Sequence, residues 1–100
     1  MSRFQEIVQQ RDFVLIDFFA TWCGPCQMMS PILEDVKKEL QEDLTILKID
    51  VDKNPKIAGI YQVRGVPTFV LFQKGKLVWR QSGMLSKRDM IELLKKYLHK

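Results

Sequence analysis

The sequence predicts an α/β protein with a central mixed β-sheet of about four strands flanked by helices. Helical and strand-like hydrophobic patterns alternate along most of the chain, and this order is typical of a parallel strand pair joined by a crossover helix. Near the C-terminus, two strand-like segments are separated only by a short turn that contains glycine, which predicts an antiparallel hairpin. One hundred residues fit one compact domain, so we expect a single domain over residues 1–100.

The first half of the chain has clear signals for each element. Ser2 and Gln5 form a capping box at the start of a first helix. Residues 13–19 are apolar on both alternating faces except at Asp17, as in a strand that is covered on both sides. A helix is predicted from about residue 23 to residue 40, because its apolar side chains fall on one face.

The second half continues with shorter elements. The same signals predict strands over 44–51, 68–73 and 77–81 and a short helix over 55–61. Ser86, with Asp89 three residues later, caps a last helix whose inner stripe contains Ile91, Leu94 and Leu98.

Charge and hydropathy argue against several classes of protein. A net charge of +4 could mark a nucleic-acid binder, but the lysines are scattered, so we expect solvated helix faces and no nucleic acid. The longest apolar run, 13–20, is interrupted by Asp17 and is too short to span a bilayer, so no membrane is expected. The N-terminus lacks the pattern of a signal peptide. We therefore expect a cytoplasmic protein, although a secreted chain after cleavage would look the same.

The only two cysteines lie in WCGPC, residues 22–26. A disulfide that closes so short a loop contributes about 2 kcal/mol, against about 4.7 for a 100-residue loop, so a bridge built for stability would lie elsewhere. A structural zinc ion needs four ligands, and two thiols with His99 are too few unless two chains pool their thiols. Gln27 follows the second cysteine where haem attachment requires histidine. Of the roles considered for these two cysteines, thiol–disulfide exchange is the one that their spacing favours.

This chemistry needs two sulfurs of unequal character within reach of each other. Cys23 lies at the start of the predicted helix, where unpaired N–H groups and the helix dipole favour a thiolate. Cys26, one turn further, is expected to be less exposed and to remain a thiol. Gly24 permits a tight backbone, and Pro25 suits the first helical turn. We expect Cys23 to be the nucleophile and Cys26 the resolving thiol of a redox-active disulfide.

Two charged residues interrupt apolar strands near this turn. The apolar surroundings of Asp17 should raise its pKa, and its strand leads directly into the cysteines; alternatively, it reaches solvent at the strand end. Lys48 interrupts the next strand, and from alternation alone it could equally face this carboxylate or solvent.

WCGPC between a strand and a helix resembles thioredoxin. The resemblance covers nearly the whole chain, and it is carried further by VLIDFFA at 14–20, DVDKNP at 50–55, RGVPT at 64–68 and GMLSK at 83–87. It implies the thioredoxin fold, with the family's usual first strand missing or very short, because only about a dozen residues precede the strand at 13–19. It also implies a protein-disulfide reductase.

The resemblance further implies roles for single residues. Asp17 is a buried carboxylate that takes the proton from Cys26 during resolution, and Lys48 modulates it electrostatically. A cis Val66–Pro67 bond faces the cysteines and leaves the Val66 backbone free to pair with an extended substrate. The predicted substrate groove is completed by Trp22, Gly24, Pro25, Gly65, Gly83 and Met84.

The family also implies the partners. We expect no metal and no bound cofactor, with electrons from NADPH through a flavoprotein thioredoxin reductase, and disulfide-containing proteins as substrates. We expect a monomer, although an apolar groove could favour transient dimers. Two alternatives stay open: an oxidoreductase or isomerase dedicated to one pathway, and a redox-silent binding module. Phe19 departs from the family, which often has a second tryptophan there, and we expect Trp79 to pack on the sheet.

Overall fold

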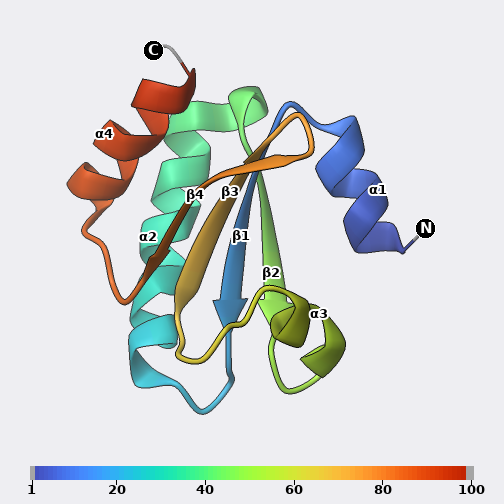
Figure 1. The fold of residues 1–100 in the computed structure, drawn as a ribbon. Coiled ribbons are helices and arrows are strands. Elements are labelled where there is room, and N and C mark those ends of the chain that lie inside the picture. Colours follow the sequence, from blue (N-terminus) through green and yellow to red (C-terminus); the bar gives the residue numbers. More distant parts are fainter. Residues whose placement is uncertain (1, 99–100) are drawn as a thin grey trace.

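The structure is a computed structural model that describes residues 2–98, so His99 lies outside the described residues. It contains a four-stranded sheet flanked by helices (Figure 1). In chain order the elements are α1 (Arg3–Gln10), β1 (Phe13–Phe19), α2 (Gly24–Leu40), the short 3₁₀ helix η1 (Gln41–Asp43), β2 (Thr45–Asp50), α3 (Pro55–Ile60), β3 (Thr68–Gln73), β4 (Lys76–Ser82) and α4 (Lys87–Leu98). The predicted strands are all present. Those at 13–19 and 68–73 have the predicted bounds, and the other two differ by one residue at each end.

The strand order is β2-β1-β3-β4. β1 pairs with β2 in parallel and with β3 antiparallel, and β3 forms the predicted antiparallel hairpin with β4. In the part of the chain that is described, α1 precedes β1 and no strand pairs with the outer side of β2, so β2 is an edge strand. The expectation of a mixed, four-stranded sheet is confirmed.

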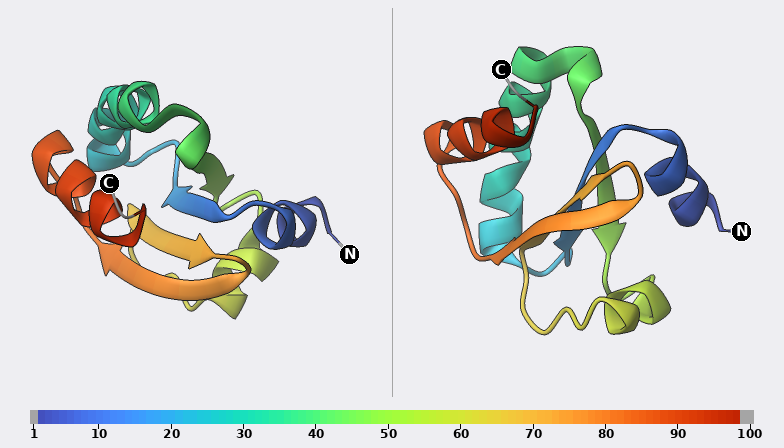
Figure 2. Two further views of the ribbon diagram at one scale, coloured as in Figure 1. Left: turned by 90° about the horizontal axis from the view of Figure 1, so that it is seen from above. Right: turned by 45° about the horizontal axis from the view of Figure 1, so that its top comes forward.

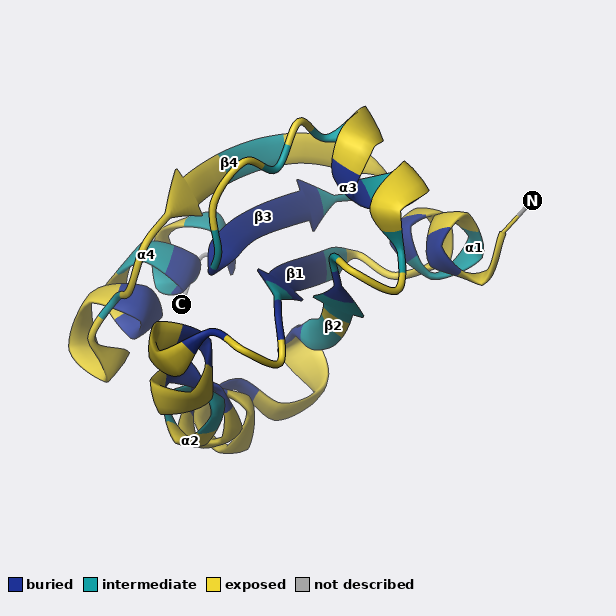
Figure 3. Ribbon diagram, turned by 90° about the horizontal axis from the view of Figure 1, so that it is seen from below, coloured by how far each residue is buried: buried dark blue, intermediate teal, exposed yellow. Residues whose placement is uncertain are grey.

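The sheet lies between two layers of helices, with α2 and α4 on one face and α1 and α3 on the other (Figure 2). The inner strands β1 and β3 are buried on both faces, whereas β4 is largely exposed and β2 partly so (Figure 3). The core on the α2/α4 face includes Leu15, Met29, Phe69, Met90 and Leu94, and the core on the other face includes Phe4, Ile16, Phe18 and Val70. Both cores fix the position of β1, the strand that leads into the cysteines.

Local signals explain the helix starts. In α1, the Ser2 N–H donates to Gln5 Oε1 at 3.0 Å and the Gln5 N–H donates to Ser2 Oγ at 3.1 Å, which completes the predicted capping box. In α4, Ser86 Oγ accepts from the Asp89 N–H at 3.1 Å. Trp79 packs against the core on the α2/α4 face, as expected. None of the helices between residues 2 and 98 combines the length and apolar character that a membrane crossing demands.

Candidate active site

The two cysteines lie where β1 ends and α2 begins. Cys23 is the N-cap residue of α2, with extended backbone angles, and Pro25 occupies the first turn. Cys23 and Cys26 are joined as a disulfide, with 5.3 Å between their Cα atoms. The Cys26 N–H points at Cys23 Sγ over 3.2 Å. One of the unpaired N–H groups at the helix start is therefore directed at the sulfur of Cys23, which favours negative charge on that atom in the reduced protein.

The two cysteines differ in their neighbours rather than in their exposure. Cys26 was expected to be the less exposed residue, but Cys23 is 5% exposed and Cys26 3% exposed in the disulfide form, so the difference is small. Cys23 Sγ lies 3.7 Å from the carbonyl oxygen of Val66, in the loop that contains the cis-proline. Cys26 instead lines a pocket that it shares with Asp17. The two sulfurs therefore differ in their surroundings: Cys23 Sγ lies beside the Val66 carbonyl, and Cys26 lies beside the Asp17 pocket.

The glycine between the cysteines does not use its conformational freedom. The φ angle of Gly24 lies outside the left-handed region, and a Cβ built on it would meet nothing within 4 Å. Gly24 was expected to permit a tight backbone, and the turn does not use the left-handed conformation that glycine allows. Gly24 instead leaves open space beside the disulfide.

The loops that the sequence analysis assigned to a substrate groove lie beside the disulfide. The Val66–Pro67 peptide bond is cis, and Cys23 faces the Val66 carbonyl. Gly83 has a φ of +94°, which favours glycine, and its N–H donates to the Pro67 carbonyl at 2.9 Å. Thr68 Oγ1 donates to the Gly65 carbonyl at 2.6 Å. These two bonds fix the ends of the segment that presents the Val66 backbone.

The side chain of Trp22 lies beside Gly65 and Val66. Trp22 is 71% exposed, and its Nε1–H donates to Asp52 Oδ2 at 2.9 Å. Met84 is also exposed. Large exposed apolar side chains are suited to contact another molecule, and the hydrogen bond to Asp52 also fixes the orientation of the Trp22 indole.

Asp17 is buried in β1, with 1% of its surface exposed. Neither carboxylate oxygen has a hydrogen-bond partner among the described residues. Burial raises the pKa of Asp17 from 3.8 to about 6, against the opposing effect of the Lys48 charge. Asp17 and Cys26 line one pocket of about 270 Å³. The expectation of a buried carboxylate with a raised pKa is confirmed, and the alternative of a solvated strand-end Asp is excluded.

Lys48 lies on the same face of the sheet as Asp17, because the two residues are register partners in the parallel β1–β2 pair. Its side chain is exposed, yet it lines the pocket that contains Asp17. Its Nζ donates to Ser30 Oγ at 2.9 Å and lies 5.8 Å from the centroid of the Phe19 ring. Strand alternation alone did not show on which face of the sheet Lys48 lies. The strand register places it on the same face as Asp17.

Sequence analysis did not identify two residues that hold site side chains. Ser30 contacts Lys48, and Asp52 holds the indole of Trp22. Ser30 could have been found from its spacing, because it lies four residues after Cys26 and therefore on the same face of the helix. No local signal points to Asp52, which meets Trp22 across 30 residues of sequence.

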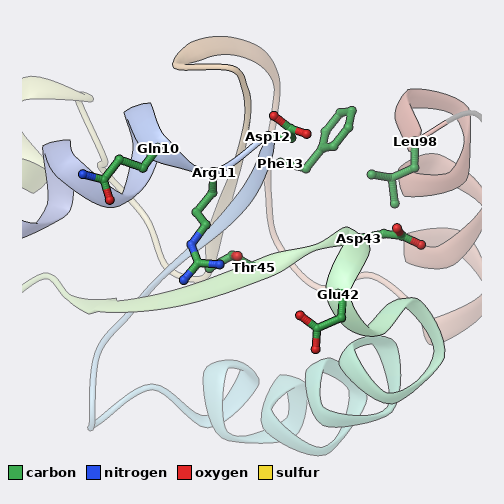
Figure 4. A pocket seen from close by; sticks show the side chains of 8 residues that line it. All are labelled: Gln10, Arg11, Asp12, Phe13, Glu42, Asp43, Thr45 and Leu98. Atoms are coloured by element: carbon green, nitrogen blue, oxygen red, sulfur yellow. The ribbon is translucent and has the colours of Figure 1, made fainter.

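A second pocket, of about 350 Å³, lies at the opposite end of the sheet, where β1 and β2 begin (Figure 4). It is lined by Gln10, Arg11, Asp12, Phe13, Glu42, Asp43, Thr45 and Leu98. It is larger than the pocket beside Cys26, but none of its lining residues within 2–98 is a cysteine. Within residues 2–98, no group of three or more His, Cys, Asp or Glu side chains is arranged to hold a metal ion. The redox chemistry therefore belongs to the cysteine end.

Comparison with known proteins agrees with this geometry. The family model described as Thioredoxin matches residues 1–96. Thioredoxin of Buchnera aphidicola is 44% identical over 94 residues, which are 94% of this chain and 86% of that protein. The bifunctional thioredoxin reductase/thioredoxin of Mycobacterium leprae is 43% identical over 90% of this chain and 20% of its own length. The structure of a mutant thioredoxin from Halobacterium salinarum covers 98% of this chain and 85% of its own, with 40% identity and a TM-score of 0.90.

A disulfide at a helix N-terminus, beside a cis-proline loop on a mixed sheet, defines a dithiol–disulfide oxidoreductase. The extent of the match then makes the family plain: the chain belongs to the thioredoxin family. It is a disulfide reductase of the thioredoxin type, with Cys23 and Cys26 as its redox-active pair. Proteins of this family act without a bound cofactor.

Proposed function

We propose that this protein reduces disulfide bonds in other proteins and is then reduced by a flavoprotein thioredoxin reductase with electrons from NADPH. The observation that carries the proposal is the position of Cys23, which caps a helix and faces the Val66 carbonyl beside the exposed indole of Trp22. A protein substrate needs such an apolar surface and a free backbone edge next to the reactive sulfur. The Mycobacterium leprae relative, whose name joins the two activities, supports the reductase as partner.

In the first step, the thiolate of Cys23 attacks one sulfur of the substrate disulfide. The substrate S–S bond breaks, its second sulfur leaves as a thiolate and takes up a proton, and a mixed disulfide joins Cys23 to the substrate. The backbone of Val66 would pair with an extended substrate segment, and Trp22 and Met84 would contact the apolar side chains of that segment.

In the second step, Cys26 resolves the mixed disulfide. The carboxylate of Asp17 takes the proton of the Cys26 thiol through the pocket that both residues line. The new thiolate attacks Cys23 Sγ, and the remaining substrate thiolate is released. Two electrons have then passed to the substrate, and Cys23 and Cys26 are left as a disulfide. Because the carboxylate must be ionised to accept a proton, this step slows as the pH falls through the Asp17 pKa of about 6.

Reduction of insulin with NADPH and a thioredoxin reductase tests this proposal. We expect turnover by the wild type and none above background by Cys23→Ser. A wild type that the reductase keeps reduced but that leaves insulin intact would contradict the proposal and favour a binding module. The Cys23–Cys26 reduction potential, measured against glutathione, distinguishes a general reductant from a dedicated oxidase or isomerase: a potential near that of protein disulfide isomerase, about −180 mV, would favour the dedicated enzyme.

We further propose that the protein works as a monomeric electron carrier in the cytoplasm, with no nucleic acid or membrane partner. The scattered lysines of its +4 net charge and the bacterial Buchnera relative support this proposal. Size-exclusion chromatography with light scattering and fractionation of the source cells test it. A stable dimer or a periplasmic location would contradict it.

A further inference from the structure

The ammonium group of Lys48, although its side chain is exposed, makes two contacts with the protein. Its Nζ donates to Ser30 Oγ at 2.9 Å and lies 5.8 Å from the centroid of the Phe19 ring. Ser30 is on α2, one turn after Cys26, and Lys48 is the register partner of Asp17 on β2. A lysine side chain has a flexible four-carbon stem, so without such contacts its charge would have no fixed place.

A second location for this charge lies close by. Ser30 and Lys48 also line an outer groove between α2 and β2, together with Glu34, Lys37 and Lys38. The Lys37 ammonium donates to the carbonyls of Gln41 and Leu44. Glu34 follows Ser30 by four residues on the same helix, which is about 6 Å further along the axis and away from Cys26. An ammonium released from Ser30 therefore has a carboxylate and open solvent to move toward, and both would take it away from Asp17.

Among the described residues that line the Asp17 pocket, Lys48 is the one with a positive charge. Beside Asp17 from α2 are the titratable Cys26 and the uncharged Gln27 and Ser30. The register partner of Asp17 on β3 is the apolar Phe69. From α4, the core on this face of the sheet receives Met90, Ile91, Leu94 and Leu98, which are all apolar. The position of one ammonium group therefore governs the electrostatic stabilisation of the Asp17 carboxylate.

We propose that Ser30 is a positioning residue that holds the Lys48 ammonium at the mouth of the Asp17 pocket and thereby favours the ionised form of Asp17. The contact itself is independent of catalysis. Its consequence for the resolving step rests on the proposed function, in which the Asp17 carboxylate takes the proton of Cys26.

The test is a double-mutant cycle read on the Asp17 side-chain carboxyl carbon by NMR titration of the reduced protein. The four proteins are wild type, Ser30→Ala, Lys48→Met and Ser30→Ala with Lys48→Met. Ser30→Ala should raise the Asp17 pKa by about 0.5, because the cation moves away. Lys48→Met should raise it further, and adding Ser30→Ala to Lys48→Met should change nothing more.

The conservative variant Ser30→Thr is the matched control, because it keeps the hydroxyl and should keep the wild-type titration. An unchanged or lowered pKa in Ser30→Ala would overturn the inference. The inference would also be overturned if Ser30→Ala raised the Asp17 pKa equally in the wild type and in Lys48→Met. The Ser30 hydroxyl would then act directly on the Asp17 carboxyl. Alanine favours helix, so Ser30→Ala should fold.

The pH profile of insulin reduction separates the inference from the proposed function. If Asp17 is the proton acceptor, the acid limb of the profile moves up with the titration, and Ser30→Ala is about two-fold slower than wild type at about pH 6. A titration that moves while the acid limb stays would support the inference and contradict the role of Asp17 as proton acceptor.

Discussion

The two ends of the sheet both have a pocket with charged side chains, but they differ in how those charges are surrounded. At the far end, Arg11, Asp12 and Glu42 are exposed to solvent. At the cysteine end, Asp17 is 1% exposed and both of its oxygens lack a hydrogen-bond partner in the described structure. Water screens the first group of charges, whereas burial makes the second sensitive to every neighbour. A reactive site is thus marked by the environment of its charges rather than by their number.

The strongest test of this comparison removes the nucleophile. Cys23→Ser should lower insulin reduction by about 10³-fold or more, because a hydroxyl is a far weaker nucleophile at neutral pH. Glu42→Gln, a matched change at the far pocket, should keep wild-type turnover. Comparable losses in the two variants would show that the far pocket also takes part in the reaction.

The next test exchanges the buried carboxyl for an amide. The folded pKa of Asp17, about 6, lies above its ordinary 3.8, so stability is lost as the pH rises through this window. Asp17→Asn removes that cost and should raise the free energy of unfolding near neutral pH by about 3 kcal/mol. The gain should vanish below pH 3.8, where the carboxyl is protonated in both states. Urea unfolding across the pH range measures it.

Asp12→Asn is the control at the far end. Because Asp12 is exposed, this substitution should change the free energy of unfolding by no more than about 0.5 kcal/mol at any pH. A neutral-pH gain from Asp12→Asn as large as that from Asp17→Asn would mean that overall charge, rather than burial, sets the effect.

Two glycines with positive φ provide a smaller test. Gly83, with φ +94°, lies at the cysteine end, and Gly75, with φ +81°, lies in the β3–β4 turn. Alanine at either position should cost about 1–2 kcal/mol in urea unfolding, because a Cβ is strained in this region. Only Gly83→Ala should also slow insulin reduction, since the Gly83 N–H holds the Pro67 carbonyl. Equal activity losses would assign both effects to stability alone.

The smallest expected effect concerns the two cations. Lys48→Met removes the charge that lowers the pKa of Asp17, so the acid limb of insulin reduction should move to higher pH, with a loss of a few-fold at about pH 6. Arg11→Met at the far pocket should leave the acid limb in place. If both variants move the limb equally, the coupling is a long-range effect of net charge, and added salt should abolish it.

Sequence analysis succeeded where the signal is local. The capping box of Ser2 and Gln5, the doubly covered strand at 13–19 and the cysteines at a helix start all appear in the structure. At Gly24, which was expected to permit a tight backbone, the turn does not use the left-handed conformation that glycine allows. Cys26 is the less exposed of the two cysteines, as expected, but the difference is small, because a loop from a distant part of the chain lies against Cys23.

Local sequence patterns predicted the elements, the cysteine at the start of α2 and the apolar surroundings of Asp17, because these depend on residues within one helical turn or one strand. The folded chain was needed to show that Asp17 is buried, that Lys48 is its register partner, that Ser30 contacts Lys48 across 18 residues and that Asp52 holds Trp22. The side of the sheet on which Lys48 lies depends on strand register, because a shift of β2 by one residue would turn Lys48 to the other face. The packing of both cores selects this register.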